Sequence, residues 1–137
     1  MSRKKYIALC ITSLAIGGMY YILFKNNTVL ENIICNYFDI IPLKSKMPKI
    51  ESSFLQYHFN DMLWAFSLQC GLCAIFAPTA TKQKTLISLS VILLGILWET
   101  AQHFGITNGT GDLLDVLSYL CGSAFSLIIT FYKGDKI

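Results

Sequence analysis

The sequence predicts an all-α membrane protein in which four transmembrane helices form an antiparallel bundle. Hydrophobic residues make up 54% of the 137 residues and charged residues only 14%, which is too little charge to coat a soluble domain. The apolar residues also gather in four runs, each close to the roughly 20 residues that a helix needs to cross a bilayer. We expect one membrane domain, residues 1–137, with spans at 6–24, 54–77, 86–104 and 113–132 and an outer loop at 25–53.

The first apolar run follows the basic segment Arg3–Lys5, a pattern that is also typical of a secretory signal peptide. The run at 6–24 is longer than the apolar region of such a peptide. Lys25 and Asn26 follow it, without a small-residue cleavage pattern. We therefore interpret this run as a retained first span.

The positions of lysine and arginine predict the orientation of the bundle. Basic residues precede the first span, fill the short second loop at Lys82 and Lys84, and follow the fourth span at Lys133 and Lys136. Short loops rich in Lys and Arg stay in the cytoplasm. We therefore expect both termini and the second loop to be cytoplasmic, and the first and third loops to lie outside. The net charge of +3 belongs to this pattern and does not indicate nucleic-acid binding.

The first outer loop contains a pattern for a short amphipathic helix. Residues 28–31 match a capping box, and apolar residues recur at helical spacing from Ile33 to Ile41. We expect this helix to lie on the outer membrane surface or over the bundle. Pro42 and Pro48 are expected to break the chain after it.

Polar side chains stand at three span ends that an up-and-down bundle brings to its outer face. Ser53 and Gln56 form a capping pattern for the second span, which places His58 and Asp61 inside that helix, one turn apart. The third span ends with Glu99, Gln102 and His103 on one face. The fourth begins with Asp112, which we expect to cap it, followed by Asp115 one turn further in.

A carboxylate within an apolar span is costly, so Glu99 and Asp115 need a partner or a function. Capping explains Asp112, whereas Glu99 lies near a helix C-terminus and opposes the helix dipole. We expect Asp61, Glu99 and Asp115 to form the centre of a polar site. Its further polar candidates are Gln102, His103, His58 and Asp112, and its expected apolar walls are Trp64, Trp98 and Tyr119.

Small residues are spaced so that helices can approach closely. Ser13 and Gly17 in the first span, and Gly122 and Ser126 in the fourth, each stand four residues apart. This spacing favours close packing between membrane helices.

Three short motifs resemble the VanZ-like family of small bacterial integral membrane proteins. They are Asp61-Met-Leu-Trp64, Glu99-Thr-Ala-Gln102 and the segment from Asp112 to Gly122, which open or close successive spans. The resemblance covers roughly residues 59–130. It matches Asp61, Glu99, Gln102, Asp115 and Gly122 to the family's characteristic positions. It implies a multi-pass protein of the bacterial plasma membrane and cell envelope, associated with resistance to the antibiotic teicoplanin.

The chain departs from this family in three places. Many members carry an arginine before the last span, where this chain reads Thr107-Asn-Gly-Thr-Gly. A histidine commonly follows the first aspartate, where Met62 to Trp64 stand here, and Tyr119 replaces a frequent asparagine. If the arginine neutralises the acidic cluster, then His58, His103 or a loop lysine must do so in this chain.

The first functional hypothesis is a non-enzymatic envelope protein. Its outward-facing acidic pocket would bind a glycopeptide, a lipid-linked envelope precursor or a cation, and no cofactor is expected. Its other partners would be the lipid bilayer and a second copy of the chain.

Two alternatives stay open. An intramembrane metal-dependent hydrolase or transferase would use His58, Asp61, Glu99, His103 and Asp115 to bind Zn or Mn, although no compact metal motif such as H-E-x-x-H is present. An ion-coupled transporter subunit would use the carboxylates as a relay. The sequence suggests polar groups at one face only and none at mid-depth toward the cytoplasm, which argues against a complete pathway in a monomer; an oligomer could complete it.

Overall fold

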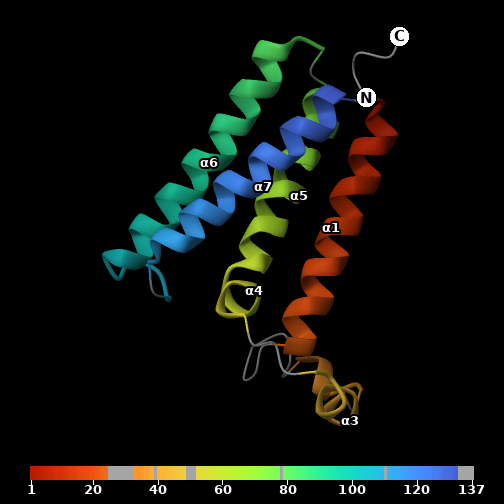
Figure 1. Ribbon diagram of the computed structural model, residues 1–137, viewed down its shortest axis with the longest axis vertical. Helices are drawn as coiled ribbons and strands as arrows, with labels where there is room; N and C mark the ends of the chain where they lie inside the picture. The colour runs from red at the N-terminus through yellow and green to blue at the C-terminus, as the bar shows by residue number, and fades with distance from the viewer. Residues whose placement is uncertain (25–32, 39, 49–51, 78, 110, 133–137) are drawn as a thin grey trace.

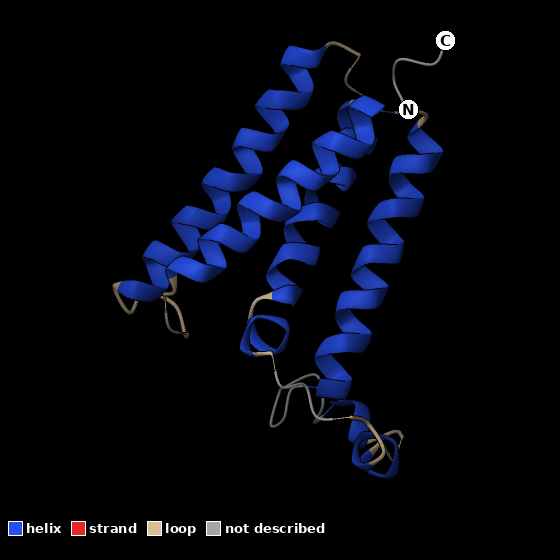
Figure 2. Ribbon diagram, in the orientation of Figure 1, coloured by secondary structure: helices blue, strands red, loops and turns tan. Residues whose placement is uncertain are grey.

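The chain folds into four long helices that run up and down next to one another. The computed structural model describes residues 1–24, 33–38, 40–48, 52–77, 79–109 and 111–132, and these residues form helices and loops without a strand (Figure 2). The long helices are α1 (Arg3–Phe24), α5 (Phe59–Phe76), α6 (Thr81–His103) and α7 (Leu113–Tyr132). Each is long and apolar enough to cross a membrane. The predicted all-helical fold, with four helices that are long and apolar enough to span a membrane, is therefore confirmed.

Successive long helices point in opposite directions (Figure 1). Helix α1 begins and α7 ends at the same end of the bundle, which we call the terminal end. The connection from α6 to α7 and the start of α5 lie at the other end, which we call the pocket end. The polar ends of three spans therefore share one end of the molecule.

Helix α5 is the centre of the bundle. It packs against α1 and α7, while α6 packs mainly on α7 and less on α5. Small residues permit these contacts: a Cβ on Gly17 would come within 2.9 Å of Asn60 Oδ1, and one on Gly122 would collide with the backbone carbonyl of Met62. Gly17 and Gly122 thus allow the close helix approach that their spacing predicts.

The second span differs from its expected form because it consists of two helices. Helix α4 (Ser53–Tyr57) ends and α5 begins at His58, and Figure 1 shows α4 end-on while α5 runs along the bundle. The N-cap of α4 is Ser52, whose side chain accepts a hydrogen bond from Leu55 N, and not Ser53 as expected. The imidazole of His58 reaches across to Asp115, a tertiary contact that local sequence signals do not contain.

Helix α6 begins earlier than the apolar run at 86–104 indicates. Lys82 and Lys84, expected in a loop, lie in its first turn. The side chain of Gln83 accepts hydrogen bonds from the backbone N–H groups of Thr79 and Ala80, which are otherwise left without partners near a helix start. This local capping lets α6 begin at Thr81, before the start of the apolar run at residue 86.

The first loop also differs from its expected form. The expected capping box at 28–31 lies outside the described residues. Residues 33–35 are helical and lead into a turn in which Tyr37 N and Phe38 N donate to Ile34 O. Pro42 does not break the chain but lies in the first turn of the short helix α3 (Ile41–Ser45). A proline fits there because the N–H that it lacks would have no partner within the helix.

Candidate ligand-binding site

A cavity of about 330 Å³ opens at the pocket end of the bundle, between the start of α5 and the α6–α7 connection. It brings together all the predicted polar candidates except His103. The residues that line it are Tyr57, His58, Asp61, Trp98, Glu99, Gln102, Gly109, Asp112, Asp115 and Tyr119.

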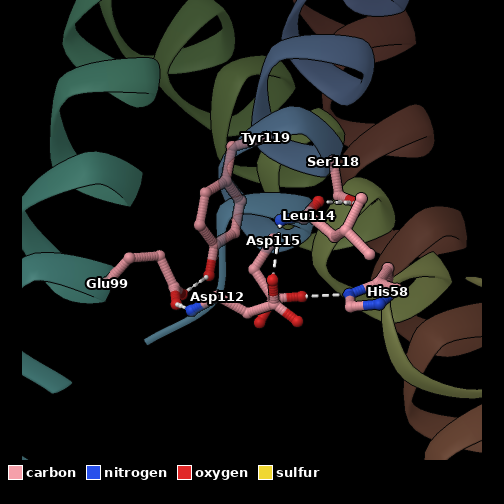
Figure 3. A network of polar contacts seen from close by, with 7 residues as sticks. All are labelled: His58, Glu99, Asp112, Leu114, Asp115, Ser118 and Tyr119. Atoms are coloured by element: carbon pink, nitrogen blue, oxygen red, sulfur yellow. Dashed lines mark hydrogen bonds and ion pairs between the residues drawn. The ribbon is translucent and has the colours of Figure 1, made fainter. Parts of the chain in front are cut away.

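Glu99 is the most buried carboxylate of this cavity, with 6% of its surface exposed. Its Oε1 accepts a hydrogen bond of 2.9 Å from the Tyr119 hydroxyl, and its Oε2 accepts one of 3.0 Å from the backbone N–H of Asp112 (Figure 3). The second bond places the carboxylate at the N-terminus of α7, where the helix dipole favours negative charge. The unfavourable position at the end of α6 is thus offset by the start of α7.

Two glycines make the surroundings of Glu99 possible. A Cβ on Gly95 would collide with the ring of Tyr119, and a Cβ on Gly111 would come within 2.5 Å of the backbone oxygen of Glu99. Trp64, an expected wall residue, does not line the cavity. It packs edge-on against Tyr119 from α5, with the ring centroids 5.8 Å apart. Gly95 was not among the predicted site residues, although a glycine in the middle of an apolar span is a signal for close packing.

His58 and Asp115 connect the two sides of the cavity. His58 Nδ1 lies 2.5 Å from Asp115 Oδ1, and both side chains are largely buried. None of the described residues that line the cavity is a lysine or an arginine. His58 is therefore the basic side chain that meets a carboxylate among these lining residues.

The remaining candidates have distinct positions. Asp112 caps α7 as expected, because its Oδ1 accepts a hydrogen bond of 2.9 Å from Leu114 N. Gln102 Nε2 donates to the backbone oxygen of Asn108 and so holds the α6–α7 connection. Asp61 lies in the first turn of α5, half-buried on the cavity wall.

His103 lies apart from the cavity. Its side chain is exposed and its ring packs against Phe104, with the centroids 5.5 Å apart. Across the described part of the chain, no three His, Cys, Asp or Glu side chains are placed to share a metal ion. The donor set expected for a metal-dependent hydrolase is therefore not assembled.

The cavity is suited to positive charge. Its walls carry the carboxylates of Asp61, Glu99, Asp112 and Asp115 against the imidazole of His58. Tyr57 and Trp98, each about half exposed (53% and 52%), add aromatic surface, and aromatic faces attract ammonium groups. Comparison of the chain with known protein families, with curated proteins and with solved structures gives no match.

Proposed function

We propose that this chain is a VanZ-like protein of the bacterial plasma membrane that binds an amine-bearing envelope molecule in an outward-facing pocket. The molecule is a glycopeptide or a lipid-linked envelope precursor, and its binding contributes to glycopeptide resistance. The observation that carries the proposal is the cavity itself, in which four carboxylates from three helices gather and no described lining residue is a lysine or an arginine.

The outward orientation rests on charge. Arg3 begins α1 at the terminal end, and Lys82 and Lys84 lie at the start of α6 at that same end. By the positive-inside tendency, the terminal end faces the cytoplasm and the pocket end faces outward. A molecule in the outer leaflet or in the cell wall then meets the cavity directly.

Within the cavity, Asp61 and Asp115 would accept hydrogen bonds from a ligand ammonium group. Glu99 already accepts two hydrogen bonds, so its role is to supply negative potential. Hydrogen bonds to charged groups contribute about 1.5–3 kcal/mol each. A cation over an aromatic face adds about 0.5–2 kcal/mol, so Tyr57 and Trp98 would strengthen the binding of an ammonium group.

The chemistry of the cavity favours binding over covalent catalysis. The His58–Asp115 pair resembles the base of a nucleophilic triad, but no serine, threonine or cysteine is among the described residues that line the cavity.

Calorimetry on the protein in nanodiscs tests the proposal. The titrants are a glycopeptide that carries a free amine and the same compound with its amine acetylated. We expect heat of binding from the first only, and weaker binding to the variants Asp115→Asn and Glu99→Gln. His103→Gln is the matched control, because it changes a polar side chain at the same end of α6 outside the cavity. Equal binding of the two compounds, or wild-type binding by Asp115→Asn, would refute the proposal.

A further inference from the structure

A cluster of polar side chains lies in the middle of the bundle, away from the cavity. The Ser123 hydroxyl donates to Gln69 Oε1, and Ser88 Oγ lies 2.6 Å from Ser123 Oγ. Gln69 and Ser123 are fully buried, and Ser88 is 3% exposed. At a rise of about 1.5 Å per residue, Ser123 lies about 12 Å beyond Asp115 along α7, near the middle of a hydrocarbon core of about 30 Å. The expectation of no polar group at mid-depth is therefore wrong.

The amide of Gln69 is not satisfied by this cluster. Its Nε2 is buried and has no hydrogen-bond partner. Exchanging the nitrogen and oxygen of the amide would satisfy the nitrogen through Ser123 but leave the oxygen alone instead. An unpaired polar group in an apolar interior costs several kcal/mol, so a small molecule that can donate and accept hydrogen bonds is favoured beside it. Water has both properties.

The cluster belongs to a continuous polar face of α7. Tyr119, Ser123, Ser126 and Thr130 recur every three or four residues and are all at least 96% buried. The Cβ atoms of such neighbours lie about 5–6 Å apart, a distance over which a single water molecule can bridge two hydroxyl groups. Cys70 Sγ contacts Ser126 Oγ at 3.5 Å, on the side toward the terminal end.

At the terminal end the face ends at Thr130, next to Phe131 in the chain. The ammonium group of Lys84, a side chain that is only 8% exposed, lies 5.3 Å from the centre of the Phe131 ring. At the pocket end the face reaches the hydroxyl of Tyr119, which donates to Glu99. The polar face thus begins at a buried carboxylate and ends near a buried amine at the other end of the bundle.

One apolar layer interrupts this connection. Ala65, Val91 and the ring of Tyr119 pack together between the cavity and Gln69, and all three are buried. The Tyr119 hydroxyl is on the cavity side of the layer and Ser123 is one turn of α7 beyond it. The hydroxyl lies on the long axis of the ring, so a ring flip leaves it on the cavity side; a change of the Cα–Cβ torsion of Tyr119 would swing it toward Ser123.

We infer that this polar face is a proton path between the cavity and the terminal end, closed in this conformation by the Tyr119 layer. In each step a hydroxyl or water releases one proton forward and accepts one from behind, so that no group gains or loses a proton overall. The ionisable groups that line the cavity end of the path are Asp61, Glu99, Asp112, Asp115 and His58. Those nearest its other end are Cys70, Cys73, Tyr6 and Lys84. The hydroxyls of Ser88 and Ser123 touch, which leaves no room for a metal cation between them.

Proton flux into lipid vesicles tests this inference. The purified protein is reconstituted around a trapped fluorescent pH indicator, and a potassium gradient with valinomycin sets the membrane potential. We expect flux above that of protein-free vesicles. Gln69→Leu should reduce it to the protein-free level, and Ser88→Ala serves as a second variant if Gln69→Leu does not insert. Tyr119→Phe keeps the ring but removes the hydroxyl, so it should also abolish flux.

Ser118→Ala is the matched control for these variants. Ser118 is as buried as Ser123 and lies on the same helix, but it donates only to the backbone oxygen of Leu114 (Figure 3). It should retain wild-type flux. Wild-type flux equal to that of protein-free vesicles, or an equal loss in Ser118→Ala and Gln69→Leu, would overturn the inference.

Discussion

Tyr119 joins most of the contacts around the cavity. Its ring fits against Gly95 and Trp64, and its hydroxyl donates to Glu99. Tyr119 therefore determines both how the Glu99 carboxylate is hydrogen-bonded and how α5, α6 and α7 pack together.

Removing the Tyr119 hydroxyl should destabilise the bundle. Tyr119→Phe leaves one oxygen of the buried Glu99 carboxylate without its donor, and we expect a loss of about 1–3 kcal/mol in the free energy of unfolding. Denaturant titration in detergent micelles, followed by circular dichroism, measures the loss. The control is Tyr37→Phe, which changes a tyrosine that is 80% exposed. Equal stability of the two variants would contradict this role for the hydroxyl.

Helix α5 depends on the residues that let its neighbours approach. Gly122 of α7 lies against the backbone carbonyl of Met62, where a Cβ has no space. Gly18 of α1 has open space at the corresponding point. The two glycines thus have different roles in the packing of the helices.

This difference gives a second stability test. Gly122→Ala should cost about 1–3 kcal/mol, because overpacking forces the helices apart. Gly18→Ala should instead be neutral or stabilising by about 0.5–1 kcal/mol, since alanine favours helix. The same denaturant titration compares them. A Gly122→Ala variant as stable as Gly18→Ala would show that α5 and α7 are farther apart than described.

The apolar runs predicted all four spans because membrane helices are specified largely by length and hydrophobicity, which are local properties. The break at His58 was not predicted in the same way. It coincides with a contact between His58 and Asp115 of another helix, which local sequence signals do not contain. The donors to Glu99 were hidden for a related reason: one is a backbone N–H, which every residue except proline carries. The up-and-down topology predicted which polar residues share the pocket end. It did not predict which of these residues pair with one another.

At the scale of the whole molecule, the proposed orientation can be measured with a native cysteine. Cys35 is exposed in the first loop, which should lie outside the cell. A membrane-impermeant maleimide should label Cys35 in intact cells and fail to label Cys35→Ser. In that background, Thr79→Cys at the α5–α6 connection should react only after permeabilisation. Labelling of Thr79→Cys in intact cells would show that the orientation is the opposite of the proposed one, with the cavity facing the cytoplasm.

The two partners of Glu99 have a consequence for how the protein is made. Tyr119 and Asp112 both belong to the segment that follows α6 directly, so the carboxylate is satisfied within the last helical hairpin alone. During synthesis this hairpin can enter the bilayer as a unit without waiting for a donor from α5. The most deeply buried acid of the cavity is thus compatible with insertion in chain order, and the His58–Asp115 contact can form afterwards, when the two halves of the bundle meet.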